Sequence, residues 1–427
     1  MLKLGPLAVL GRDGRLLFAT RIVRMFAYGS LSVVLVLYLA SLGIDDLHIG
    51  LLLTLTLVGD AVISLWLTTH ADAVGRRRVL QVGAVLMVAA GVVFSVSGDF
   101  LVLVIAATIG VMSVSGGEVG PFQAVEQAAL SHILPDRERT RIFGWYSLAG
   151  FFAAATGALA AGLLVQGGLA IGAPRADAYR AVILGYSVIG LLLAVAFGQL
   201  TQAIEVAAAT GPPIATRLGL HRSQGIVLRL SGLFALDAFG GNLVSQSLVA
   251  YWFTLRFGAE PASLGAIFFA ANILAGLSGL VAARLAPRYG LVRTMVLTHL
   301  PSNLLLLVLP FMPSLPLAAI VLLAHFSLNK MDIPARQSYI LAVVDPNERS
   351  AAAGVTSMAR TAGGATAPSI ATPLIGIPGL AGLPFLIAGV TKVAYDLILY
   401  RLFVGLRPPE EREGREDETD GANPPLD

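Results

Sequence analysis

Long apolar runs recur along the whole chain and alternate with short polar segments. A helix needs about 20 predominantly apolar residues to cross the hydrocarbon of a bilayer. Twelve such runs occur, and they predict an all-α polytopic membrane protein with twelve transmembrane helices. The predicted spans are 20–43, 48–69, 79–97, 100–132, 140–166, 179–200, 227–255, 263–285, 293–313, 315–342, 350–375 and 381–404.

The amino-acid composition supports this interpretation. Hydrophobic residues make up 56% of the 427 residues and charged residues 13%, whereas soluble domains have roughly 45–50% and about 25%. A soluble protein of this size cannot bury so much aliphatic surface. The chain has no cysteine, which excludes disulfides and cysteine-ligated metal sites. A soluble enzyme, a disordered protein and a secreted disulfide scaffold are therefore all excluded.

Basic residues are distributed unevenly between the two sides of the predicted helices. With the N-terminus inside, 22 of the 29 lysines and arginines lie on the cytoplasmic side and three lie in outer loops. Positive charge favours the cytoplasmic side of a membrane. We therefore expect both termini to be cytoplasmic, in a bacterial inner or plasma membrane.

The polar segments also predict the domain organisation. Residues 201–226 are the longest polar interruption and predict a cytoplasmic linker. They separate an N-terminal six-helix bundle, 1–200, from a C-terminal six-helix bundle, 227–406. The acidic tail, 407–427, is predicted to be disordered and cytoplasmic.

A weak internal repeat supports two pseudo-symmetric halves. The spacing A-x-x-x-G-x-x-R follows the second predicted span and recurs after the eighth. Two further matches fall at similar offsets, and matches in register indicate a duplication. The paired segments are 71–78 with 286–293, Pro121 with Pro334, and 138–140 with 348–350.

This layout resembles the major facilitator superfamily of secondary transporters, over roughly residues 15–405. The most specific element is the loop after the second span, where the family pattern is G-x-x-x-D-R-x-G-R-R. Asp72, Gly75, Arg76 and Arg77 match it, while Thr68 and Ala73 replace the leading glycine and the first arginine. The resemblance implies the twelve-helix fold of that superfamily. It also implies that the four matching residues form a cytoplasmic gate between the halves; the alternative is that the arginines only set the topology.

The fifth span lacks one signature of the superfamily. Its antiporter subgroup carries a Gly-Pro pair there, and this span has no proline. The drug–proton antiporter subgroup is therefore not supported. We interpret the glycines of this span, Gly144, Gly150, Gly157 and Gly162, as positions of close helix packing.

Ten ionisable residues fall inside the predicted spans, where charge is costly unless it faces a cavity or a partner. Four are cationic and six are carboxylates, which predicts a surplus carboxylate that can carry a proton. The ten residues are Asp60, Glu118, Glu126, Asp237, Lys330, Asp332, Arg336, Arg360, Lys392 and Asp396.

Some of these charges have a structural interpretation. Asp332 with Arg336 and Lys392 with Asp396 stand at i,i+4, so each pair is expected to form a local ion pair. Glu126 and Arg336 lie near the cytoplasmic ends of their spans and are expected to reach water. Arg21 is expected to extend to the lipid headgroups.

The remaining groups are candidates for function. Asp60, Glu118 and Asp237 are candidates for proton coupling. Candidates for contacting the solute are Arg24, Tyr28, Asn242, Gln246, Lys330 and Arg360. The resemblance implies that spans 1, 4, 7 and 10 line a central cavity, so Glu118 and Lys330 are expected to face each other across it. Structural ion pairs and interhelical hydrogen bonds remain the alternative.

Catalytic and metal chemistry have no positive support in the sequence. Of the six histidines, only His325 is expected deep in a span, and no cluster has metal-ligand spacing. No Walker nucleotide motif, nucleophile elbow or H-E-x-x-H motif occurs. We expect a protein that is not an enzyme, with no cofactor, no metal and no nucleic-acid partner.

Together these features predict a monomeric secondary active transporter that works by alternating access and is coupled to protons. Its partners would be a small polar, anionic or amphiphilic solute, a proton or other coupling ion, and membrane lipids. Two alternatives stay open: a non-transporting membrane sensor or scaffold of the same fold, and a lipid-handling transporter. The identity of the substrate, uptake or efflux, and the mode of coupling do not follow from the sequence.

Overall fold

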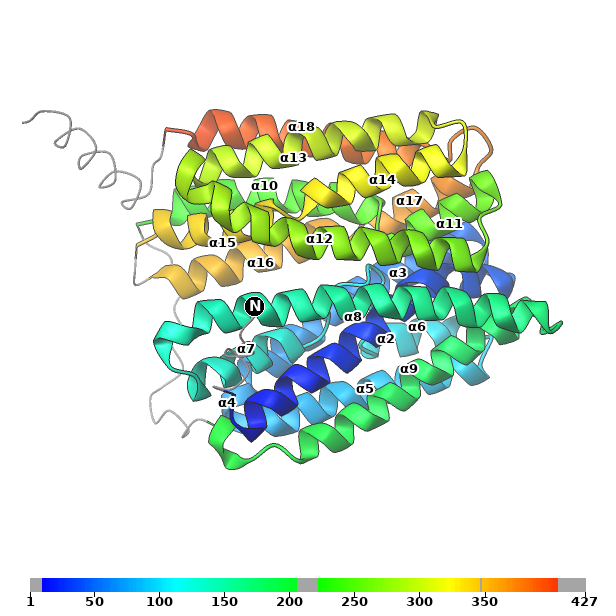
Figure 1. Cartoon of the computed structure of the whole chain (residues 1–427), viewed down its shortest axis with the longest axis horizontal. Coiled ribbons are helices and arrows are strands. Elements are labelled where there is room, and N and C mark those ends of the chain that lie inside the picture. Colours follow the sequence, from blue (N-terminus) through cyan, green and yellow to red (C-terminus); the bar gives the residue numbers. More distant parts are fainter. Residues whose placement is uncertain (1–9, 206–221, 346–347, 406–427) are drawn as a thin grey trace, which may run out of the picture.

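The computed structural model describes residues 10–205, 222–345 and 348–405, and within these ranges every regular element is a helix (Figure 1). The helices before residue 206 are α2 (Arg12–Ser41), α3 (Asp46–Thr69), α4 (Ala71–Val74), α5 (Arg76–Val96), α6 (Phe100–Ile109), α7 (Phe122–Ile133), α8 (Asp136–Ala170), α9 (Arg175–Gly198) and the 3-10 turn η1 (Gln202–Ile204). The later ones are α10 (Gln224–Leu243), α11 (Gln246–Phe257), α12 (Pro261–Tyr289), α13 (Leu291–Val308), η2 (Leu309–Phe311), α14 (Leu315–Asn329), α15 (Asp332–Val343), α16 (Arg349–Ala365), α17 (Ala367–Gly376) and α18 (Leu383–Phe403).

Each of the twelve predicted spans contains one helix or one broken pair of helices. Nine segments of the described ranges are long and apolar enough to cross a membrane. One of these nine segments is itself broken, into α10 and α11, and the other three predicted spans are also divided in two, as α6 with α7, α14 with α15, and α16 with α17. The predicted all-α polytopic fold is therefore confirmed. Most of the predicted linker and the predicted tail lie outside the described residues, and the division into domains stays a prediction.

The break in the fourth span follows from its glycines and proline. Gly116 and Gly120 have positive φ angles of 73° and 75°, a conformation that favours glycine. Pro121 directly precedes α7, because proline fits the start of a helix but not its interior. The freed backbone N–H of Gly120 donates to the carboxylate of Asp60 at 2.6 Å.

The helices alternate in direction, so their turns gather at two ends of the molecule. We call them the Gly75 end and the Gly43 end, after a glycine with a positive φ angle in a turn at each. The Gly75 end also holds the turn at Gly290, the last residue before α13. It is the end that the charge distribution predicts to be cytoplasmic.

Two groups of helices lie side by side, one from each part of the chain (Figure 1). In the first group α2 packs on α8 and α9, and in the second α10 packs on α16 and α18. The groups meet where α8 packs on α12 and where α3 packs on α17. We call these groups the first and second halves.

The prediction that the glycines of the fifth span are positions of close helix packing is confirmed for two of them. A Cβ atom on Gly157 would lie against the backbone carbonyl of Phe26 in α2, well inside contact distance. A Cβ on Gly162 would collide in the same way with the carbonyl of Pro261 in α12. Gly144, by contrast, has open space at its Cβ position. The glycine at 157 therefore lets α2 and α8 approach closely.

Replacing Gly157 by valine is expected to lower stability by about 1–3 kcal/mol, because the side chain must push α2 away from α8. The measurement is the apparent unfolding temperature of the purified protein in detergent. Gly144→Val is the matched control, since it places the same residue in the same helix without a collision. Equal changes in the two variants would contradict the packing role.

Candidate functional site

A cluster of charged side chains lies inside the first half. Arg24 of α2 donates two hydrogen bonds to Glu126 of α7, at 2.5 and 2.8 Å. It also contacts Glu118, in the break between α6 and α7, at 3.2 Å. Arg21 of α2 pairs with the same Glu118. We call Arg21, Arg24, Glu118 and Glu126 the first ionic cluster.

An aromatic side chain completes the first ionic cluster. Tyr146 of α8 donates its hydroxyl to Glu126, and Arg21 lies over the Tyr146 ring at 4.1 Å from its centroid. Arg21 also donates through Nε to the Tyr146 carbonyl at 2.7 Å. A planar guanidinium that binds a carboxylate through two bonds compensates the cost of burial.

Two structural expectations for this region are wrong. Arg21 is buried rather than extended to lipid headgroups, and Glu126 is fully buried rather than in contact with water. Both side chains are drawn inward because each finds an opposite charge in a neighbouring helix. Arg24 and Tyr28 are also fully buried in this structure, and their predicted contact with the solute stays a prediction.

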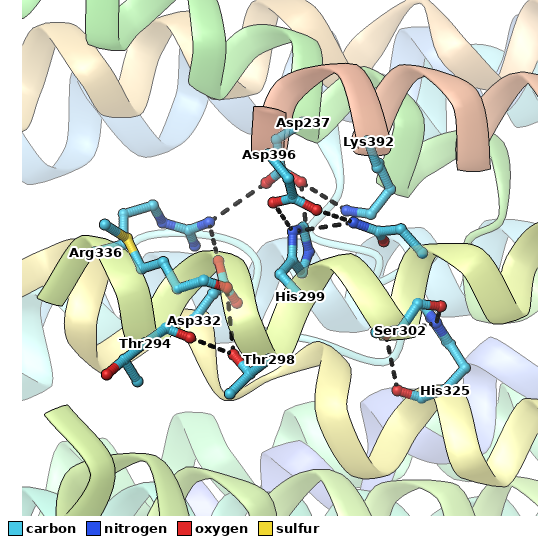
Figure 2. Close-up of polar contacts among 12 residues, drawn as sticks. Asp237, Thr294, Thr298, His299, Ser302, His325, Asp332, Arg336, Lys392 and Asp396 are labelled. Atoms are coloured by element: carbon cyan, nitrogen blue, oxygen red, sulfur yellow. Dashed lines mark hydrogen bonds and ion pairs between the residues drawn. The ribbon is translucent and has the colours of Figure 1, made fainter. Parts of the chain in front are cut away.

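A second cluster lies inside the second half and is centred on Asp237 of α10. Lys392 of α18 donates to Asp237 Oδ1 at 2.6 Å. Arg360 of α16 and Arg336 of α15 donate to Asp237 Oδ2 at 3.1 and 3.3 Å. One carboxylate thus joins four helices. We call Asp237, Asp332, Arg336, Arg360, Lys392 and Asp396 the second ionic cluster; Figure 2 shows all of these except Arg360 by label.

The two predicted local pairs of this region have different outcomes. Arg336 donates to Asp332 at 2.6 Å, which confirms the first pair. Arg336 is nevertheless buried and does not reach water as expected. The prediction that Lys392 pairs with Asp396 is wrong, because the Lys392 ammonium group binds Asp237 instead. Asp396 instead binds His299 and Asn303 of α13, each at 2.8 Å.

The clusters change the charge balance that the sequence predicts. Arg21 and Arg24 join the four predicted cations, so the first ionic cluster has two charges of each sign and the second has three. Glu118 pairs with Arg21 and Arg24 of its own half, and its predicted position opposite Lys330 stays a prediction. Within the described residues, three of the ten groups form no ion pair with a lysine, arginine, aspartate or glutamate: Asp60, Lys330 and Asp396, the last of which binds His299.

Polar contacts between the halves gather towards the Gly43 end. Gln246, the first residue of α11, donates to Ser32 of α2 at 2.7 Å and accepts from Asn272 of α12 at 3.2 Å. This is the interhelical hydrogen bonding that was the alternative to solute binding for Gln246. The other candidate amide, Asn242, packs against the backbone of Gly364 in α16.

Further hydrogen bonds join the halves in the same region. Ser247 of α11 donates to the Ser32 carbonyl at 2.8 Å. Tyr251 of the same helix donates to Asp46, the first residue of α3, at 2.7 Å. The Ser369 N–H of α17 donates to Thr54 of α3 at 3.1 Å. The halves are therefore joined at the Gly43 end.

The predicted gate residues lie at the opposite end. Gly75 has a φ angle of 101°, which suits glycine, and it ends the short helix α4. The backbone N–H groups of Arg76 and Arg77 donate to the carboxylate of Glu205 at 2.7 and 3.1 Å. An anion at a helix N-terminus is favourable, so Glu205 caps α5. The side chain of Asp72 lies outside the described residues.

The arginines of this loop contact their own half in this structure. The Arg76 side chain donates to the carbonyls of Ile204 and Ala128, at 3.1 and 3.3 Å. Arg77 donates to the Leu200 carbonyl at 3.3 Å. The gate between the halves that the resemblance implies for these residues stays a prediction.

Three residues that bind charged or backbone groups at these sites are not among the residues predicted from the sequence. His299 of α13 is 2% exposed and lies between two carboxylates, so the expectation that only His325 is deep is wrong. Tyr146 lies in the fifth predicted span, where nothing in the sequence distinguishes it from other aromatic residues. Glu205 was assigned to the linker by its position. Of these three residues, only His299 could have been found from the sequence, since it is a histidine that falls well inside a predicted span.

Comparisons with known proteins agree with the helical arrangement. The family model of the Major Facilitator Superfamily matches residues 17–328 and 230–426. The uncharacterized membrane protein YJR124C of Saccharomyces cerevisiae is 30% identical over 429 residues, which covers 92% of this chain and 95% of that protein. This relative is from yeast and gives no support to the expectation of a bacterial membrane.

Solved structures share the fold at low identity. A point mutant of the nucleoside transporter NupG has a TM-score of 0.74 at 12% identity, with 91% of this chain and 99% of that chain covered. A D-xylose-proton symporter has a TM-score of 0.72 at 14% identity, with 90% and 96% covered. A bacterial homologue of the human lysosomal transporter Spinster has a TM-score of 0.67 at 16% identity, with 92% and 97% covered. These three solved structures are of transporters rather than enzymes, and this chain is a multi-pass membrane protein that belongs to the Major Facilitator Superfamily.

Proposed function

We propose that this protein is a proton-coupled secondary transporter that moves a small polar, anionic or amphiphilic solute by alternating access. The observation that carries the proposal is the distribution of polar contacts. Each ionic cluster holds the helices of one half together, whereas the hydrogen bonds that Ser32, Asp46 and Thr54 accept from the second half join the halves at the Gly43 end. Two internally braced halves joined at one end are suited to rocking about a central site.

The direction of opening fits the predicted topology. We propose that both termini are cytoplasmic, so that the joined Gly43 end faces outward and the Gly75 end faces the cytoplasm. The Spinster homologue with the same fold was solved in an inward-facing conformation. Because the chain has no cysteine, single cysteines at Arg78 and Gly172 would report the two sides by labelling in intact cells.

Two cations of the second half are the proposed contacts for an anionic solute. Arg360 is one-third exposed and shares Asp237 with Arg336 and Lys392. Lys330 lies at the break between α14 and α15 and forms no ion pair with a described residue. Both can therefore accept an anionic group without the loss of an exclusive partner.

Of the three candidate carboxylates for proton coupling, we prefer Asp60 to Glu118 and Asp237. Glu118 and Asp237 each bind cations, whereas Asp60 accepts only neutral hydrogen bonds, from Gly120 at 2.6 Å and Ser64 at 3.3 Å. Binding a proton would remove a charge that no described cation compensates. Asp60 is thus the preferred coupling carboxylate, with Glu118 and Asp237 as the alternatives.

The proposal is tested with the full-length protein in proteoliposomes that contain a pH-sensitive dye. Nucleosides, D-xylose and small organic carboxylates are added in turn, the first two because fold neighbours bear those names. At least one solute class is expected to enter and to move protons with it, and an imposed pH gradient is expected to change its flux. Flux that ignores the gradient would contradict proton coupling.

Replacing Asp60 by asparagine is expected to abolish the effect of the pH gradient on solute flux. Asparagine still accepts the hydrogen bond from Gly120 but binds no proton at neutral pH. Exchange of solute without a gradient should persist, and the unfolding temperature should change little because no ion pair is broken. A variant that responds to the gradient like the wild type would show that Asp60 is not the coupling group.

A non-transporting sensor or scaffold of the same fold is the second candidate function. It is favoured by the pairing of the charged groups within each half, since Glu118 binds Arg21 and Arg24 of its own half. Cysteines at Thr54 and Ser369, whose positions already touch, separate the two functions. A transporter must open this contact, so the cross-link should form only in part of the population and should stop flux. A scaffold would cross-link completely.

A further inference from the structure

An open groove lies on the outer side of the second half, between α13 and α18. These two helices pack side by side along the edge of the second half that faces away from the first half (Figure 1). The groove has a volume of about 270 Å³ and contains no member of either ionic cluster. Its lining residues are Arg293, Val296, Leu297 and Leu300 of α13 and Leu397 and Tyr400 of α18.

The walls of the groove follow the periodicity of the two helices. Arg293, Leu297 and Leu300 stand at i, i+4 and i+7, on one face of α13, and Leu397 and Tyr400 stand at i,i+3 on α18. Leu297 and Leu397 are 62% and 54% exposed. Leucines exposed on the outer side of a multi-pass membrane protein face the hydrocarbon of the bilayer, where apolar surface carries no cost. The occupant of the groove therefore comes from the lipid.

The groove carries charge at one end only. Because α13 begins at Leu291 and α18 ends at Phe403, Arg293 and Tyr400 lie at its Gly75 end, and leucines line the rest. Arg293 is exposed and forms no ion pair with a residue that the structure describes. A ligand that fills this groove would thus meet a cation at one end and aliphatic side chains along its length.

A second cation lies beside the same end. Arg401 follows Tyr400 in the last turn of α18, is exposed, and also lacks an ion-pair partner within the described ranges. It stands four residues after Leu397 and so on the same face of the helix. Tyr400 itself is 41% exposed, and tyrosine is enriched where a membrane meets water. This end of the groove therefore has the composition of a headgroup contact.

We infer that the groove between α13 and α18 binds an anionic phospholipid, with an acyl chain along the leucines and the phosphate at Arg293. Anionic lipids are concentrated in the cytoplasmic leaflet, and basic pockets between membrane helices on that side bind their headgroups. The Gly75 end is the end proposed to be cytoplasmic, so the arginine lies at the matching surface. A zwitterionic lipid also offers a phosphate, but its own ammonium group offsets the attraction to two arginines. The inference goes beyond the proposed transport function and does not depend on it.

Native mass spectrometry of the full-length protein, released from detergent micelles, counts the lipids that stay bound. Phosphatidylserine and phosphatidylcholine with identical acyl chains are offered in equal amounts, and the wild type is expected to retain one phosphatidylserine in preference. Arg293→Gln should lower the retained fraction about fivefold, the factor for one cation near a membrane surface. Arg229→Gln is the matched control, since Arg229 is an exposed arginine near the start of α10 that does not line the groove. Equal retention of the two lipids, or equal losses in the two variants, would overturn the inference.

A second pair of variants tests whether the acyl chain occupies the groove. Leu297→Trp fills the groove but keeps Arg293, so it is expected to reduce the retention of phosphatidylserine severalfold. Leu304→Trp places the same side chain on α13 outside the groove, at a residue that is 48% exposed, and should retain the lipid like the wild type. Both positions are exposed, so the unfolding temperature in detergent should change little in either variant. Equal retention by the two tryptophan variants would show that the lipid does not lie between α13 and α18. Because no solute is needed, the result stands whether or not the protein transports.

Discussion

Replacement of Arg24 by methionine is expected to lower the stability of the protein by about 3–5 kcal/mol, because it leaves the buried carboxylate of Glu126 without its cation. Arg24 is fully buried and binds Glu126 through two hydrogen bonds. Glu126 would keep only neutral donors, the hydroxyl of Tyr146 and, at 3.5 Å, the hydroxyl of Thr20. Methionine preserves much of the side-chain length, so the loss reports charge rather than volume.

The measurement is the apparent unfolding temperature in detergent, followed by size-exclusion chromatography. Arg180→Met is the control, since Arg180 pairs with Asp177 at an exposed helix end and such pairs contribute only about 0–1 kcal/mol. The double variant Arg24→Met with Glu126→Met should recover part of the loss, because it removes the stranded charge. A double variant less stable than Arg24→Met alone would refute this explanation.

Asp237→Ala should have a comparable effect in the second half, again about 3–5 kcal/mol. Lys392, Arg360 and Arg336 all bind this carboxylate, so its removal leaves three like charges close together. Their mutual repulsion adds to the cost of their burial. We expect a lower unfolding temperature and a shift of the protein towards aggregated fractions.

Asp60→Asn is the control for Asp237→Ala. It shows whether the loss of any carboxylate inside the membrane lowers stability, or only the loss of one that binds cations. Asp60 has no cation partner among the described residues, so its replacement should leave the unfolding temperature nearly unchanged. Adding Lys392→Met to Asp237→Ala should raise stability again by removing one unpaired cation. Asp237 and Asp60 variants of equal stability would show that Asp237 does not organise the cluster.

The candidate site could be predicted from the sequence as a set of charges but not as a set of pairs. Asp237, Arg360 and Asp60 were recognised because charge inside an apolar run is unusual, whatever lies around it. Asp332 with Arg336 was also predictable, since both stand on one helix. Lys392 and Asp396 have the same spacing, yet each binds elsewhere.

The sequence by itself determined the membrane class, the apolar runs in which the helices lie and the position of the Gly75 turn. Each depends on a local property, either the mean hydropathy of some twenty residues or the conformational freedom of one glycine. The tertiary structure alone decided that Arg21 turns inward, that Lys392 prefers Asp237 to Asp396, and that His299 lies between two acids. These outcomes depend on which helices meet and at what height, because in a low dielectric a charge binds the best-placed opposite charge rather than the nearest one in the sequence.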